Sequence, residues 1–187
     1  MRARFEREIE VLAALRHPNI VTVHATEIVD GQPLLVMEWV DGVPIDRWAA
    51  RQTGTQAVLR TFIAVCDAVH HAHQHGVIHC DLKPTNVLVD REGQPHVLDF
   101  GLARLIGPGA SAIGATLSEG FVGTPAYSSP EQIAGRRAQI DARSDVFSLG
   151  VVLYEVLTGA WPFATAGTRR PSAVLSEVFD AIRLNDP

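Results

Sequence analysis

The chain has 187 residues, 47% hydrophobic and 20% charged, which is ordinary for a soluble globular domain with one sizeable core. Its formal net charge of −5 argues against a nucleic-acid-binding surface as its main function. No run approaches the roughly 20 apolar residues that span a bilayer, and its two cysteines lack metal-ligand spacing, so we expect a cytoplasmic protein with no membrane segment.

The first predicted element is a helix over residues 4–15, which ends before His17 and Pro18. Its apolar residues fall on one face at helical spacing, and Glu8 lies in the middle of that face. A carboxylate on a buried face is costly unless it is paired. The simplest partner for Glu8 is Arg4, one turn earlier in the same helix.

Two strands and a long helix are predicted next. Residues 20–29 and 33–40 are typical of strands and are joined by a turn at residues 30–32. Residues 55–75 predict a long helix with Gly76 as its stop. Four histidines near the end of this helix suggest metal binding: His70, His71, His73 and His75. We do not expect a metal site there, because no carboxylate or cysteine completes a recognisable ligand set.

The most informative stretch is residues 79–101, HCDLKPTNVLVDREGQPHVLDFG. Apolar runs at residues 86–89 and 96–98 flank a turn at residues 90–93, which predicts a β-hairpin. Polar side chains lie at its two mouths: Asp81, Lys83, Asn86 and Asp99. Because a hairpin folds its ends together, we expect these groups to meet. Carboxylate and amide oxygens suit Mg²⁺ and a lysine can hold a phosphate, so the stretch predicts a Mg²⁺–phosphate site.

The rest of the chain predicts a loop and two helices. Residues 107–120 contain four glycines and no apolar periodicity, so we expect a flexible loop. Residues 144–158 are apolar nearly all round and predict a buried helix, with Ser144 as its N-cap and Gly159 as its end. A last amphipathic helix is predicted over residues 174–184.

Five segments resemble eukaryotic-like (bacterial Hanks-type) serine/threonine protein kinases. HCDLKPTN at residues 79–86 and DFG at residues 99–101 resemble the catalytic and metal-binding loops of that family. RFEREIEVLAALRHPNIV resembles its helix C, LVMEWVDG the segment between the lobes, and GTPAYSSPE the end of the activation segment. The resemblance implies an α+β, protein-kinase-like two-lobe fold. Residues 1–38 would form a partial N-lobe of helix C and the last strands, and residues 39–187 a mostly helical, incomplete C-lobe.

The resemblance also implies site residues and partners. Asp81 would accept or orient the proton of a substrate hydroxyl, Lys83 would offset charge on the γ-phosphate of ATP, and Thr124 would touch both. Asn86 and Asp99 would bind Mg²⁺. Five further positions would contact the nucleotide or its lysine partner: Glu8, Met37, Glu38, Val40 and Leu88. The implied partners are ATP and a protein carrying serine or threonine, with no nucleic acid.

Supporting contacts are implied in the same way. Asp145 would brace the catalytic loop, although a simple preference of aspartate for a helix N-terminus is the alternative. Glu131 would pair with an arginine that, in the family, lies beyond the last residue of this sequence. Four side chains would form an internal spine: Leu12, Val23, His79 and Phe100.

The sequence departs from the family pattern in two places. No GxGxxG loop and no strand lysine precede Glu8, so we expect weak ATP binding and little transfer from these 187 residues alone. Cys80 stands where the family has an arginine that holds a phosphate on the activation loop. We therefore expect that phosphorylation of Ser111, Thr116 or Ser118 is not the main switch.

Three functions remain open at this point. The first is the catalytic region of a serine/threonine kinase that belongs to a longer protein with further domains. The second is a non-catalytic interaction module. The third is a small-molecule phosphotransferase of the aminoglycoside-kinase type. The intact catalytic and metal residues argue against the second function. Lys83 and the SPE at residues 129–131 argue against the third.

Overall fold

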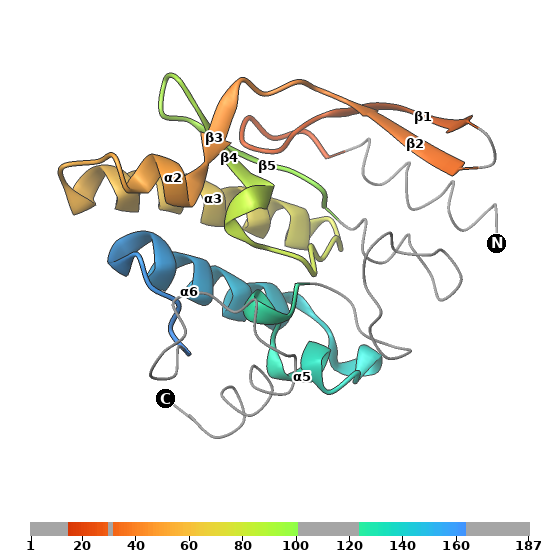
Figure 1. Cartoon of the computed structure of the whole chain (residues 1–187). Helices are drawn as coiled ribbons and strands as arrows, with labels where there is room; N and C mark the ends of the chain where they lie inside the picture. Colours follow the sequence, from red (N-terminus) through yellow and green to blue (C-terminus); the bar gives the residue numbers. More distant parts are fainter. Residues whose placement is uncertain (1–14, 30–31, 101–123, 164–187) are drawn as a thin grey trace.

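The computed structural model describes residues 15–29, 32–100 and 124–163, which are coloured in Figure 1. Several predictions fall outside these residues: the helices at 4–15 and 174–184, the loop at 107–120, and the positions of Glu8 and Leu12. In the described part, a β-hairpin lies at one end of the molecule, a second small sheet follows it, and the helices lie beyond that sheet (Figure 1).

The predicted first hairpin is confirmed, with shorter strands than expected. β1 (Val23–Val29) pairs antiparallel with β2 (Gln32–Met37). Residues 19–21 do not extend β1, because they pair with the second sheet: the Val21 amide donates to the Val97 carbonyl at 3.0 Å, and the Val97 amide donates to the Asn19 carbonyl at 2.8 Å. This pairing ties the first hairpin to the sheet that carries the predicted site.

The second sheet contains the predicted hairpin of the 79–101 stretch. β4 (Val87–Asp90) pairs antiparallel with β5 (Pro95–Val97), and β3 (Gly42–Pro44) pairs with the other edge of β4. Side chains alternate along β4, with Val87 and Val89 buried and Leu88 half-buried on the other face. A Cβ on Gly42 would lie 2.8 Å from the Val89 carbonyl oxygen, so only glycine fits where β3 meets β4.

Two long helices form the body of the molecule with the short α2 (Ile45–Ala49). α3 (Thr55–Gln74) ends one residue before the prediction, and Gly76 follows with a φ of 73°. α6 (Ala142–Thr158) packs against α3. The core is an apolar cluster from α3, α6 and both strands of the second hairpin, and its members include Phe62, Val65, Val69, Leu82, Val87, Val97 and Val152.

Two predictions about α6 are wrong. Its N-cap is Asp141, whose carboxylate accepts from the Arg143 amide at 2.8 Å, and Ser144 lies buried in the first turn. The helix is also not buried all round, because Val146 is 61% exposed and Tyr154 46% exposed. Its end is as predicted, since Gly159 is left-handed with a φ of 69°. Among the described residues, no helix is both long and apolar enough to cross a bilayer.

Candidate active site

Three predicted site residues form a closed triangle of short contacts. Lys83 Nζ lies 2.6 Å from Asp81 Oδ2 and donates to Thr124 Oγ1 at 2.8 Å. The Thr124 hydroxyl in turn donates to Asp81 Oδ1 at 2.8 Å. The Asp81 and Lys83 side chains are each about a quarter exposed, so a substrate group can approach them from solvent. The structure thus brings Thr124 to two residues that lie 41 and 43 positions earlier in the sequence.

Asn86 contacts the same carboxylate, at the oxygen that also contacts Lys83. It ends a 3-10 turn, Pro84–Asn86, which Pro84 starts and which leads directly into β4. Its Nδ2 donates to the Asp81 carbonyl at 2.9 Å and lies 3.4 Å from Asp81 Oδ2. Since Nδ2 makes both contacts, Oδ1 of this amide has no donor among the residues that the structure describes.

Asp99 lies in surroundings where a nearby cation would stabilise its ionised carboxylate. It follows β5 in a left-handed conformation, with a φ of 61°. Burial raises the pKa of Asp99, and nearby Asp81 raises it further, although His79 and Lys83 oppose this rise. A divalent cation would offset both the burial and the repulsion from Asp81. The Asp99 oxygens and the Asn86 amide oxygen are hard ligands, so this donor set fits Mg²⁺.

His79 connects the catalytic loop to the residues around Asp99. Its Nδ1 accepts from the Asp81 amide at 3.2 Å, so its Nε2 donates to the Leu98 carbonyl at 2.8 Å. The ring is fully buried, and this burial lowers its pKa, although the nearby Asp145 carboxylate opposes the shift. Its centroid lies 4.8 Å from that of Phe100, as the resemblance implied for the spine.

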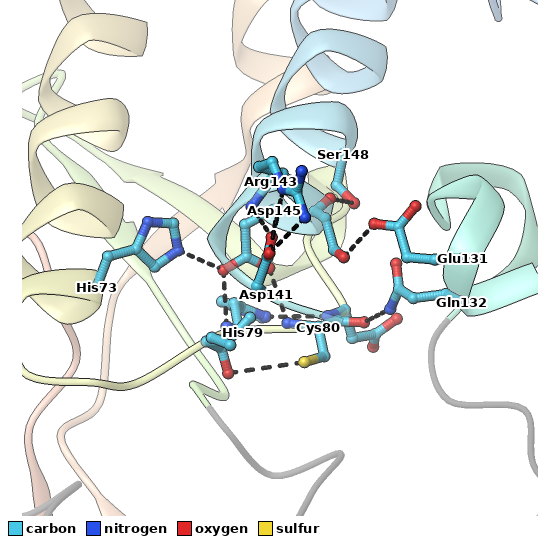
Figure 2. A network of polar contacts seen from close by, with 12 residues as sticks. His73, His79, Cys80, Glu131, Gln132, Asp141, Arg143, Asp145 and Ser148 are labelled. Carbon is cyan, nitrogen blue, oxygen red and sulfur yellow. Dashed lines mark hydrogen bonds and ion pairs between the residues drawn. The ribbon is translucent and has the colours of Figure 1, made fainter. Parts of the chain in front are cut away.

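The predicted brace from Asp145 is present. Figure 2 shows this side chain at the centre of a polar network, and it is completely buried. Asp145 Oδ2 accepts from the His79 amide at 2.8 Å and lies 2.7 Å from His73 Nε2, while Oδ1 accepts from the Cys80 amide at 2.9 Å. Three donors therefore compensate the buried charge, and the brace is more than a helix N-terminal preference.

The segment after Thr124 is fixed to α6 and to Trp161 by contacts that the sequence did not predict. Ser148 Oγ donates to the Tyr127 carbonyl at 2.7 Å, and Trp161 Nε1 donates to the Ala126 carbonyl at 2.7 Å. The Tyr127 hydroxyl donates to a Glu155 oxygen at 2.6 Å. One sequence signal was available, because polar side chains interrupt the apolar pattern of α6.

Glu131 accepts a hydrogen bond from the first turn of α6, a partner that the resemblance did not imply. The Ser144 hydroxyl on α6 donates to its Oε1. Burial alone would raise the pKa of Glu131, but hydrogen bonds, chiefly from Ser144, lower it below its usual value. Ser144 therefore anchors the start of α5 (Pro130–Ile133) to the first turn of α6.

The predicted nucleotide-contacting residues lie on both sheets. Met37 ends β2 and lines a small cavity of about 20 Å³ together with Val23, Asp99 and Phe100. The Glu38 amide donates to the Thr22 carbonyl at 2.9 Å, which continues the β1–β2 pairing into the predicted linking segment. Val40 and Leu88 are half-buried, with Leu88 opposite His96 on the face of the β4–β5 hairpin that lies away from the core.

Comparison with known proteins identifies the family. The protein kinase domain model matches residues 1–185. Serine/threonine-protein kinase PknB of Mycolicibacterium smegmatis is 43% identical over 167 residues, which cover 86% of this chain and 26% of that relative. Pkn1 of Myxococcus xanthus, also named a serine/threonine-protein kinase, is 37% identical over 191 residues, covering 96% of this chain and 27% of the relative.

The chain belongs to the protein kinase domain family and is similar to its bacterial serine/threonine members. The predicted family and the α+β fold class are therefore confirmed. The kinase hypothesis is also favoured over the interaction module and the small-molecule phosphotransferase. The chain spans about a quarter of the length of the curated relatives that it matches.

Proposed function

We propose that this protein transfers the γ-phosphate of ATP to serine or threonine hydroxyls of a protein substrate. The observation that carries the proposal is the triangle of Asp81, Lys83 and Thr124, whose contacts measure 2.6 to 2.8 Å. Lys83, Asn86 and Thr124 all orient one carboxylate at a position open to solvent. The names of the relatives, which are serine/threonine-protein kinases, support the same reaction.

In this proposal Asp81 is the proton acceptor. A carboxylate offers about four acceptor positions, and Thr124, Lys83 and Asn86 occupy up to three of them. Among the contacts of the described residues, at least one position remains for the substrate hydroxyl. Its proton would move to Asp81 as its oxygen attacks the γ-phosphorus of ATP, and the bond between that phosphorus and the bridging oxygen of ADP would break. Such positioned proton transfer contributes roughly 10²- to 10⁴-fold to the rate. Lys83 would move from Asp81 toward the transferred phosphate, where its charge stabilises the transition state.

We assign the metal and nucleotide sites to the remaining predicted residues. Asn86 and Asp99 would hold Mg²⁺, which when bound neutralises charge on the β- and γ-phosphate oxygens. Leu88, Met37, Glu38 and Val40 would form the adenine side, and Glu8 would pair with a lysine of the nucleotide site. The proposed boundary between a smaller lobe at residues 1–38 and a larger lobe at residues 39–187 lies next to these adenine contacts.

The test uses the protein expressed from its natural gene, with Mg²⁺-ATP and a generic protein substrate such as casein. Phosphoserine and phosphothreonine should form, without phosphotyrosine. Mg²⁺-ATP should also raise the melting temperature, and Asp99→Ala should abolish both effects. Asp67→Ala, an exposed carboxylate on α3, is the matched control and should change neither. A melting-temperature shift without any transfer would favour the interaction module, and transfer only to an aminoglycoside would favour the small-molecule phosphotransferase.

A further inference from the structure

Cys80, the residue directly before Asp81, has an unusual backbone conformation. Its φ is 66°, in the left-handed region that residues other than glycine adopt only when the surrounding structure holds them there. Its carbonyl belongs to the peptide group that joins it to Asp81. The orientation of that peptide group therefore sets the direction in which the Asp81 side chain leaves the backbone.

A buried amide side chain holds this carbonyl. Gln132 on α5 is only 1% exposed, and its Nε2 donates to the Cys80 carbonyl oxygen at 2.6 Å (Figure 2). Its Oε1 accepts from the Ser129 amide at 2.9 Å and lies 3.1 Å from the Ser129 hydroxyl. Because the Ser129 amide can only donate, the Gln132 side chain has one orientation, with its NH₂ group directed at Cys80.

Two buried hydrogen bonds hold Cys80 in this conformation. Asp145 on α6 accepts from the Cys80 amide, and Gln132, 52 residues away in the sequence, donates to the Cys80 carbonyl. The segment that supplies Gln132 also supplies Thr124, which contacts the Asp81 carboxylate itself. Residues 124–132 therefore hold the catalytic loop at two points, one on the side chain of Asp81 and one on the backbone before it.

We propose that Gln132 is a positioning residue for phosphate transfer. Its hydrogen bond orients the peptide between Cys80 and Asp81, so that the Asp81 carboxylate points at the substrate hydroxyl. The inference rests on the proposed function of Asp81 as proton acceptor. The activity of Asp81 then also depends on the fold of residues 124–132, although Asp81 itself lies outside this segment.

Gln132→Glu tests the hydrogen bond with almost no change in shape. An ionised carboxylate still accepts from Ser129 but repels the Cys80 carbonyl, whereas a protonated carboxyl group donates to it. The kcat of Gln132→Glu should be about 10- to 100-fold below wild type at pH 8 and should recover toward pH 6, with an unchanged KM for ATP. Gln132→Met, which has no donor, should be low at both pH values. Ser129→Ala, which keeps the backbone amide contact with Gln132 Oε1 and removes the capping and hydrogen-bonding contacts of the Ser129 hydroxyl, should stay within a few-fold of wild type.

Amide hydrogen exchange keeps this inference separate from the proposed function. In the 187-residue chain, the amide hydrogens of residues 79–86 should exchange faster in Gln132→Met than in wild type. In Gln132→Glu they should exchange faster at pH 8 but not at pH 6, once the rates are corrected for intrinsic exchange. Loss of transfer in every protein including wild type would refute the proposed function while leaving this readout intact. If folded Gln132→Met had the exchange rates and the kcat of wild type, the positioning role of Gln132 would be refuted. This result decides the question even if Gln132→Glu does not fold.

Discussion

Asp145 is the residue whose replacement should most clearly expose how the catalytic loop is held. Asp145→Asn keeps the shape of the side chain but replaces one oxygen by an NH₂ group. With the NH₂ group at Oδ1, it faces the amide of Cys80; at Oδ2, it faces the amide of His79 and also Nε2 of His73. The His73 ring can change tautomer and accept, but a backbone amide cannot.

In either orientation one buried backbone amide loses its acceptor. Leaving a buried donor unsatisfied costs about 1 to 3 kcal/mol, so Asp145→Asn should lower the free energy of unfolding by about that amount. Asp145→Ala removes the acceptor for both amides and should cost about 2 to 6 kcal/mol. These are large fractions of the roughly 5 to 15 kcal/mol that stabilises a typical domain.

Urea denaturation of the 187-residue chain measures this loss as a shift of the midpoint at constant m-value. The matched control is Asp67→Asn on the exposed side of α3, which should change the free energy of unfolding by less than about 0.5 kcal/mol. If Asp145→Asn were as stable as Asp67→Asn, the catalytic loop would not depend on Asp145 for its amide partners, and the brace would be refuted.

Three further predictions follow from the site and the sheet. Thr124→Val removes the hydroxyl between Lys83 and Asp81 and should lower kcat about tenfold or more, while Thr124→Ser should restore it; equal loss in both variants would contradict this role. Asp99 has a folded pKa above its ordinary value of 3.8, so its ionisation costs stability once the pH rises through the folded pKa. Asp99→Asn should therefore raise the melting temperature at pH 7 without Mg²⁺, with less gain near pH 4; a lower melting temperature at pH 7 would contradict it. Gly42→Ala forces a Cβ against the Val89 carbonyl and should cost about 1 to 3 kcal/mol in urea denaturation. Gly150→Ala within α6, with no atom within 4 Å of its Cβ, is the control, and an equal loss in both variants would refute the steric argument.

Local patterns predicted the second hairpin and α3 because their signals lie within a few residues. Asp90 is both the end of β4 and the acceptor for the amides of Glu92 and Gln94, so the turn is encoded where it forms. Gly76 likewise ends its helix through its own backbone. β3 was not predicted, because its three residues are too few to show an alternating pattern. It forms by pairing with the edge of β4, which lies far away in the sequence.

The contacts that complete the site could not be predicted from local patterns. Gln132 and Trp161 bind backbone carbonyls 52 and 35 residues away, and any residue type has a carbonyl to offer. The N-cap of α6 was misassigned for a related reason. Asp141 and Ser144 are both good N-cap residues, and the contact of Ser144 with Glu131 on a different helix places Ser144 inside the first turn. Asp145 was predicted only through the resemblance to protein kinases.

The most direct test of the central claim is the kcat of Asp81→Asn in the protein expressed from its natural gene, measured together with its affinity for Mg²⁺-ATP. The asparagine keeps the contacts of the side chain with Thr124 and Lys83 within reach but cannot take up a proton. We predict a loss in kcat of roughly 10²- to 10⁴-fold with an affinity for Mg²⁺-ATP close to that of wild type. A kcat within a few-fold of wild type would show that the Asp81 carboxylate is not the proton acceptor and would contradict the proposed mechanism.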